Sequence, residues 1–237
     1  MDDINVIDHP FKRKVILEIG GEYTGFGYEY FDSPEAVTGF RGYRSDGNAA
    51  EGQRDFAVEA RRISLIPGVR TVFDLGCAKG FLVEALRTLG VEAYGIDVSD
   101  YAIELADPSV RPYLRRMSVQ DLESDEQYDL VHVNGVLVYL AMREIKRALR
   151  RFHDIARVGV MVGGPTREQI LKWYEKEDVS AIDPLRKQEI SQAEWDRLIA
   201  EAGFEKDMAY YRKRVGAHSP AAVSISNGQQ PFELRGG

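Results

Sequence analysis

The chain has little of what marks a secreted, membrane-bound or metal-bound protein. It has one cysteine, Cys77, among 237 residues, so it cannot close an internal disulfide, which favours a reducing cytoplasmic location. No apolar run approaches a membrane span, and the first residues lack the basic and apolar regions of a signal peptide. No His, Asp or Cys cluster has metal-ligand spacing. We therefore expect a cytoplasmic protein with no metal and no membrane partner.

The chain also lacks an excess of positive charge. Its formal net charge is −7, which disfavours nucleic acid as a partner. The basic residues at 143–151 alternate with apolar ones at helical spacing, so we interpret them as a solvated helix face. The length and an apolar content of 44% fit one α/β domain with a substantial core.

The most informative stretch lies at residues 71–86. A β-leaning run reaches Asp74, a turn with Gly76 and Gly80 follows, and a helical pattern begins at Phe81. A strand, a glycine turn and a helix form the first half of a nucleotide-binding βαβ unit. Glycine lets the backbone turn sharply and lets a ligand approach it closely, while helix N-terminal amides favour a negative group.

The second half of the unit follows at residues 91–96 and ends at Asp97. A carboxylate at this strand end can accept hydrogen bonds from both ribose hydroxyls of an adenosine. A dinucleotide fingerprint needs three glycines, and here position 78 is Ala, which disfavours an NAD-linked oxidoreductase. Asp74 would attract an ammonium group. These features indicate an adenosine that carries an amino acid.

Four motifs in order resemble class I S-adenosylmethionine (SAM)-dependent methyltransferases. Residues 74–80 resemble the SAM signature, 95–99 the second motif, 118–122 the third and 128–134 the fourth strand. The resemblance covers roughly residues 55–215. It implies SAM as the cofactor.

The resemblance and the alternation of strands and helices imply an α/β, Rossmann-like class I methyltransferase fold. We expect a seven-stranded, mostly parallel sheet with helices on both faces, an antiparallel last strand and an aromatic N-terminal cap. The expected strands are 70–75, 92–97, 112–116, 128–134, 157–163 and two within 204–226. The expected helices are 55–66, 80–90, 100–106, 142–155, 166–177 and 191–202, the last with a Ser-x-x-Glu capping box.

We predict three parts of the chain. Residues 1–54 form a cap or lid. Residues 55–227 form the SAM-binding catalytic domain, with a helical insertion at about 165–188. Residues 228–237 form a C-terminal tail.

The resemblance implies a set of cofactor contacts at the carboxyl ends of the strands. In it Asp97 holds the ribose and Asp121 the adenine amino group. The predicted contacts are Asp74, Gly76, Cys77, Ala78, Gly80, Asp97, Val98, Gln120, Asp121, Leu122 and Asn134.

Methyl transfer from a sulfonium needs mainly alignment and exclusion of water, and a base only when the acceptor keeps its proton. Many relatives have Glu-x-Leu-Glu-His after the fourth strand. Here Gly135, Val138 and Tyr139 stand in that loop, so no base carries over. His132 is interpreted as a packed core histidine. We predict Asn134 and Tyr174 as catalytic residues. The predicted substrate pocket, whose rings would attract a sulfonium, consists of Tyr28, Tyr30, Phe31, Tyr139 and Trp173.

The favoured function is methyl transfer from SAM to a small-molecule acceptor in specialised metabolism. One alternative is cyclisation of SAM itself to azetidine-2-carboxylate and methylthioadenosine. Others are a non-catalytic SAM-binding module that regulates or interacts, and RNA methylation. The oligomeric state stays open, with a homodimer as one option.

Overall fold

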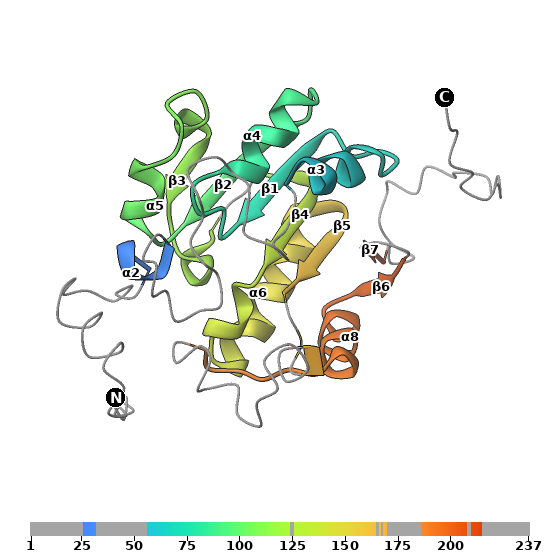
Figure 1. Cartoon of the computed structure of the whole chain (residues 1–237). Coiled ribbons are helices and arrows are strands. Elements are labelled where there is room, and N and C mark those ends of the chain that lie inside the picture. The colour runs from blue at the N-terminus through green and yellow to red at the C-terminus, as the bar shows by residue number, and fades with distance from the viewer. Residues whose placement is uncertain are drawn as a thin grey trace.

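A computed structural model of the chain describes residues 26–31, 56–123, 126–164, 166, 168–169, 186–207 and 210–214. Within these ranges seven strands form one sheet in the order β3-β2-β1-β4-β5-β7-β6 (Figure 1). The strands are β1 (Thr71–Leu75), β2 (Glu92–Asp97), β3 (Leu114–Arg116), β4 (Tyr128–Asn134), β5 (Ala156–Gly163), β6 (Phe204–Lys206) and β7 (Tyr211–Lys213).

The sheet is mostly parallel. The pairs from β3 through β5 are parallel, and β7 runs antiparallel to both β5 and β6. The expectations of a seven-stranded Rossmann-like sheet and an antiparallel last strand are confirmed. Parallel strands end at one edge, so β1, β2, β3 and β4 bring their carboxyl ends together there.

Helices cover both faces of the sheet (Figure 1). The face under α3, α4 and α5 buries one apolar cluster, and the face under α6 and α8 buries a second, larger one. The helices of these two layers are α3 (Phe56–Ser64), α4 (Phe81–Thr88), α5 (Asp100–Glu104), α6 (Met142–Ile155) and α8 (Gln192–Glu201). This is a doubly wound α/β domain. No helix in the described part of the chain is long and apolar enough to cross a bilayer.

Strong periodicity gave accurate helix bounds. The expected helix at 142–155 is α6, whose inner face buries Ile145, Leu149, Phe152 and Ile155. The Ser191 hydroxyl accepts a bond from Glu194 N at 3.2 Å, as expected of the N-cap of α8.

One expected strand needs correction. The strand expected at 112–116 begins only at Leu114, because Pro112 lies in the 3-10 helix η1 (Arg111–Tyr113) and cannot donate to a ladder. Strands β6 and β7, three residues each, lie within the expected range 204–226. Residues 215–237 and most of the expected helix at 166–177 lie outside the described residues.

Candidate cofactor site at the carboxyl edge of the sheet

The turn from β1 to α4 is tight and packed. Gly76 and Gly80 have φ of 78° and 79°, and Ala78 lies between them with φ of 50°. The amides of Gly76 and Cys77 both donate to the Ile96 carbonyl, at 2.7 and 3.0 Å. A Cβ on Gly76 would lie 2.0 Å from Val136 Cγ2, so only glycine fits against the loop that follows β4.

Asp97 closes β2 and bonds to this turn. Its Oδ2 accepts from Ala78 N and its Oδ1 from Ser99 N, both at 2.9 Å. Burial raises the pKa of Asp97 to about 6; the amides of Ser99 and Ala78 offset part of the shift, and the Asp74 carboxylate adds to it. Each carboxylate oxygen keeps acceptor capacity for a further donor.

The ends of β3 and β4 complete the edge. After β3, the Ser118 hydroxyl caps the 3-10 helix η2 (Val119–Asp121) by accepting from Gln120 N at 3.1 Å. Asp121 is exposed, Gln120 half-buried and Leu122 buried. Asn134, the last residue of β4, is half-buried.

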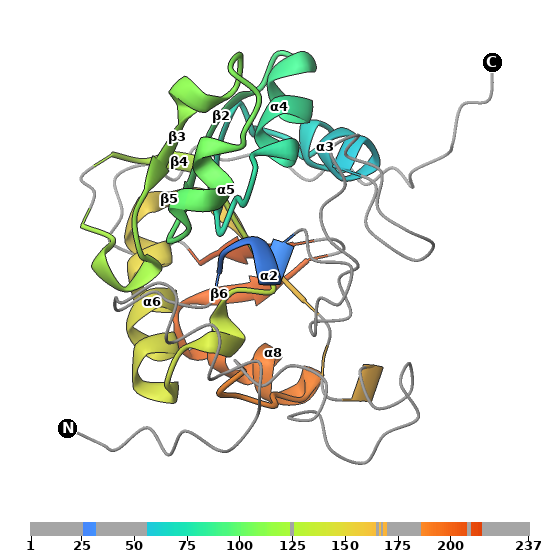
Figure 2. The same cartoon turned by 60° about the vertical axis from the view of Figure 1, so that its left-hand side comes forward.

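An aromatic segment covers this edge. The short helix α2 (Tyr28–Phe31) lies beside α5 (Figure 2), where Phe31 stacks on Tyr101 at 6.4 Å. The Tyr30 and Tyr139 hydroxyls lie 3.0 Å apart, and the Phe26 ring meets both rings edge-on at 5.0 and 5.2 Å. These residues pack with Ala78 of the glycine turn.

Ser99 joins the aromatic segment to Asp97. Its hydroxyl donates to the Phe26 carbonyl and accepts from Ala102 N at 3.0 Å, while its own amide bonds to Asp97. Phe26 and Ser99 were not among the predicted site residues. An Asp-x-Ser before a helix is a local signal for the Ser99 cap, whereas a contact across 73 positions has no local signal.

The structure brings most of the predicted cofactor contacts to one edge. Gly76, Cys77, Ala78, Gly80, Asp97 and Val98 come from β1, β2 and the turns that follow them, and Gln120, Asp121, Leu122 and Asn134 come from the ends of β3 and β4. Their roles there stay predictions. Trp173, Tyr174 and the side chain of Tyr28 lie outside what the structure describes.

Asp74 has a partner that the sequence did not indicate. His132 is buried, as predicted, and its Nδ1 lies 2.6 Å from Asp74 Oδ1. Glu59 of α3 is buried on the same side, with its Oε1 3.9 Å from His132 Nε2. The signal for Glu59 was its place on the apolar face of the helix, three residues after Phe56 and four before Ile63.

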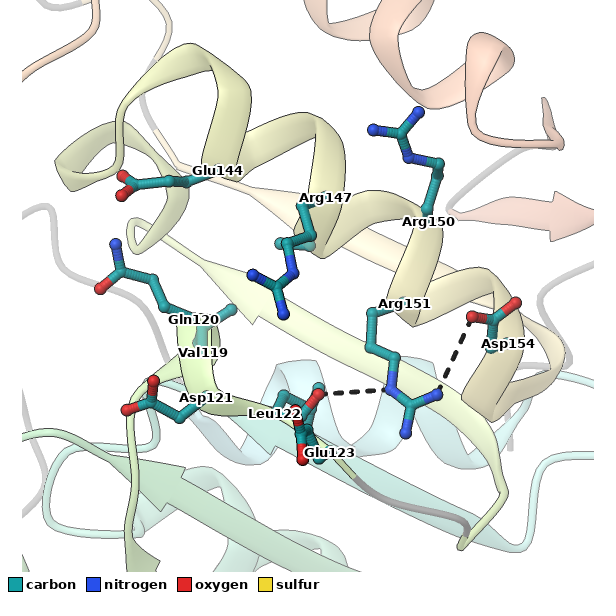
Figure 3. Close-up of a pocket in the computed structure, with 11 residues that line it drawn as sticks. Val119, Gln120, Asp121, Leu122, Glu123, Glu144, Arg147, Arg150, Arg151 and Asp154 are labelled. Atoms are coloured by element: carbon teal, nitrogen blue, oxygen red, sulfur yellow. Dashed lines mark hydrogen bonds and ion pairs between the residues drawn. The ribbon is translucent and has the colours of Figure 1, made fainter.

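A groove of about 820 Å³ lies between η2 and α6 (Figure 3). Charged side chains dominate its walls, and Arg151 spans it by donating to the Leu122 carbonyl at 3.3 Å. The groove borders the cofactor edge because it shares Gln120, Asp121 and Leu122 with the predicted adenine contacts. It is lined by Val119, Gln120, Asp121, Leu122, Glu123, Glu144, Arg147, Ala148, Arg150, Arg151 and Asp154.

Comparison with known proteins identifies the domain. Residues 73–162, which run from β1 almost to the end of β5, match a family described as "Methyltransferase domain". This part of the chain is similar to methyltransferase domains, and its strands have the order of the Rossmann-like class I methyltransferase fold.

One curated relative and two solved structures illustrate the likeness. A ubiquinone biosynthesis O-methyltransferase of Azorhizobium caulinodans is 26% identical over 161 residues, which cover 65% of this chain and 62% of the relative's length. A SAM-dependent methyltransferase from Archaeoglobus fulgidus has a TM-score of 0.54 at 18% identity, covering 63% of this chain and 68% of the other. A magnesium protoporphyrin IX methyltransferase from Synechocystis with bound SAH has a TM-score of 0.50 at 18% identity, covering 69% and 87%. These structures share the fold of the methyltransferase domain.

Proposed function

We propose that the chain transfers a methyl group from SAM to a small-molecule acceptor. The observation that carries this proposal is the aromatic cover over the cofactor edge. Phe26 and Tyr30 pack on Tyr139 in the loop after β4, and Phe26 also accepts a bond from Ser99 beside Asp97. Such a cover favours an enclosed pocket for a small acceptor over an open groove for a polymer such as RNA.

The residues at this edge fit an adenosyl cofactor that carries an amino acid. The glycine turn presents backbone without side chains, which suits close approach of the amino-acid part. The buried Asp97 carboxylate has acceptor capacity left for two ribose hydroxyls. We propose that Asp121 and Leu122 hold the adenine. The other proposed contacts are Asp74, Cys77, Ala78, Val98, Gln120 and Asn134.

The chain's contribution to the reaction is mainly alignment. The cofactor supplies an activated methyl group when bound, because its leaving group is a neutral thioether. The rings of Tyr30 and Tyr139 exclude water and favour a cation beside them, by about 1–2 kcal/mol where the site is dry. We propose that Asn134 and Tyr174 orient the reacting groups, and that Tyr28, Phe31 and Trp173 also line the pocket.

The loop after β4 restricts the acceptor. Its residues 135–140 include no carboxylate and no imidazole, so this loop offers no strong base. We therefore propose an acceptor that enters as a nucleophile already, such as a neutral amine or a carboxylate. The Tyr30–Tyr139 hydroxyl pair would hold it by hydrogen bonds.

The absence of a strong base from the loop at 135–140 also favours a second candidate reaction. Without a base in the loop and with aromatic rings over the edge, SAM itself is a possible substrate. Its amino group would attack its own γ-carbon, giving azetidine-2-carboxylate and releasing methylthioadenosine.

Product analysis tests both reactions. Purified protein is incubated with SAM alone and with a panel of amines and carboxylates, and the nucleoside released is identified by mass spectrometry. Methyl transfer gives S-adenosylhomocysteine only when an acceptor is present, whereas cyclisation gives methylthioadenosine without one. Neither product under any condition would contradict both reactions and favour a binding module without catalysis.

The remaining proposals concern organisation. We propose a cap at 1–54, a catalytic domain at 55–227 with an insertion at about 165–188, and a tail at 228–237. We further propose a role in specialised metabolism. A lone cysteine supports a cytoplasmic location.

A further inference from the structure

Three ionisable side chains lie together beneath the cofactor edge, and of these only Asp74 is among the proposed contacts with SAM. Glu59, Asp74 and His132 are 7%, 4% and 3% exposed. His132 Nδ1 lies 2.6 Å from Asp74 Oδ1, and His132 Nε2 lies 3.9 Å from Glu59 Oε1. The imidazole therefore stands between two buried carboxylates.

The positions of these residues follow from the fold. Asp74 of β1 and His132 of β4 are direct partners in the parallel register, so their side chains leave the sheet on the same face. This face carries α3, whose inner side presents Glu59 beside Ala60 and Ile63. The cluster thus connects three elements that are far apart in the sequence.

Burial makes the hydrogen bond of this cluster important. A buried carboxylate is costly unless a donor meets it, and a carboxylate can only accept, so Nδ1 carries the proton of the bond to Asp74. The bond at 2.6 Å fixes the ring plane and directs Nε2 toward α3. Removing the His132 imidazole would take from the buried Asp74 carboxylate the donor that it has in Nδ1.

The cluster lies close to the cofactor edge along both strands. Gly76 follows Asp74 by two residues, and Asn134 follows His132 by two. Gly76 begins the turn after β1 and Asn134 ends β4, so a shift of Asp74 or His132 would act on backbone only two residues from the cofactor edge. The Gly76 turn tolerates little movement, since it already packs on Val136.

We propose that His132 is a positioning residue for SAM binding: bonded to Asp74 and facing Glu59, it fixes the carboxyl ends of β1 and β4 relative to α3. The inference rests on the proposed contacts of Gly76 and Asn134 with SAM. It does not depend on which reaction the bound SAM undergoes.

Four variants test the inference by calorimetric titration with SAM and by thermal unfolding of the same samples. His132→Leu removes both nitrogens at similar volume, and we expect the Kd for SAM to rise at least tenfold. His132→Asn places an amide nitrogen where Nδ1 lies, and we expect it to restore most of the affinity. Glu59→Gln keeps the shape of the side chain and should raise the Kd about threefold. Asp129→Asn alters a buried carboxylate at the opposite end of β4 and should lower Tm without changing the Kd.

The outcomes separate this inference from the proposed reaction. If His132→Leu lowers Tm but binds SAM with the wild-type Kd, His132 is structural only and the inference is wrong. If His132→Leu does not fold, an unchanged Kd in Glu59→Gln together with a tenfold loss in His132→Asn overturns it. Failure of methyl transfer would appear instead in the wild-type product analysis, with SAM binding intact.

Discussion

Asp97 at the carboxyl edge of the sheet and Asp129 at the amino edge accept the same kind of bonds but differ in charge balance. Asp97 accepts the amides of Ala78 and Ser99, and Asp129 Oδ2 accepts those of Arg70 and Thr71, all four at 2.9 Å. Both carboxylates are buried. The geometry alone would assign them the same role.

Their pKa shifts go in opposite directions. Burial raises the pKa of Asp97 to about 6, and the two amides fail to offset it. Burial also acts to raise the pKa of Asp129, but the amides of Arg70 and Thr71, helped by the Thr71 hydroxyl and Arg157, outweigh it and lower the pKa.

The difference lies in how deeply each carboxylate is buried, with Asp97 much the deeper, and in the neighbours. Arg157 Nη1 lies 3.3 Å from Asp129 Oδ1, whereas Asp97 has the Asp74 carboxylate in its vicinity. At the amino edge, two backbone amides and Arg157 of the chain itself stabilise the Asp129 carboxylate, as expected of a residue with a structural role. At the carboxyl edge the charge is left for further donors, and the two hydroxyls of a ribose are such donors.

The largest effect is expected from replacing a glycine, and it is measured by comparing two glycines that have the same backbone conformation at the two edges. Gly76 and Gly90 have φ of 78° and 79°, but only at Gly76 would a Cβ collide, 2.0 Å from Val136 Cγ2. We expect Gly76→Ala to cost about 1–2 kcal/mol for the left-handed backbone and about 1–3 kcal/mol more for overpacking.

Gly90→Ala is the matched control for that variant. Nothing lies within 4 Å of its Cβ, so we expect it to cost only the backbone strain of about 1–2 kcal/mol. Urea unfolding gives both free energies, and titration gives the Kd for SAM. Gly76→Ala should lose SAM affinity and Gly90→Ala should keep it. Equal behaviour of the two variants would mean that the turn at Gly76 has no special part in the site.

The glycine turn also illustrates what could be predicted from the sequence. The fold followed from local patterns, since Asp74, Gly76, Gly80 and Asp97 lie within one continuous βαβ unit. Helix α6 was predicted at its observed bounds because its apolar residues repeat through four turns. Strands of only three residues, such as β6 and β7, have too little periodicity for their bounds to be predicted in this way.

The side-chain partners of the site could not be predicted. His132 and Asp74 are 58 positions apart, and their contact depends on the register of β1 with β4. Glu59 lies on the apolar face of its helix, but a charged side chain in a sequence is expected at the solvent-exposed surface, so its burial was not predicted. The charge balance that separates Asp97 from Asp129 depends in the same way on residues distant in the sequence, such as Arg157.

The next effect concerns stability at the amino edge. Asp129→Ala removes the acceptor of two backbone amides, and each amide left without a partner costs about 1–3 kcal/mol, less where water reaches it. Since Arg70 is exposed, we expect a loss of about 2–3 kcal/mol in urea unfolding. The Kd for SAM should stay within twofold of wild type. A tenfold weaker Kd in the folded variant would show that both edges serve the cofactor.

Asp97→Ala makes the reverse prediction. Losing a charged acceptor of two hydroxyls should weaken SAM binding by about 1–3 kcal/mol, measured by titration calorimetry near pH 8. Stability should change less than in Asp129→Ala, because removing a poorly solvated carboxylate offsets part of the cost of two unpaired amides. An unchanged Kd would count against Asp97 as the ribose contact.

The smallest expected effect is on pH dependence, and it follows from the pKa of Asp97 near 6. Because the folded pKa lies above the unfolded value of 3.8, the folded chain holds this proton more tightly. Ionising Asp97 therefore lowers stability as pH rises from about 4 to about 6.

SAM should bind the ionised form of Asp97, whose oxygens accept from both ribose hydroxyls. Its affinity should therefore be constant above pH 7 and fall up to about tenfold per unit below pH 6, or about 1.4 kcal/mol. Asp97→Asn should bind more weakly than wild type but without this slope between pH 5 and 7. If both proteins show the same slope, a group other than Asp97 is titrating and the charge balance at the two edges does not explain cofactor binding.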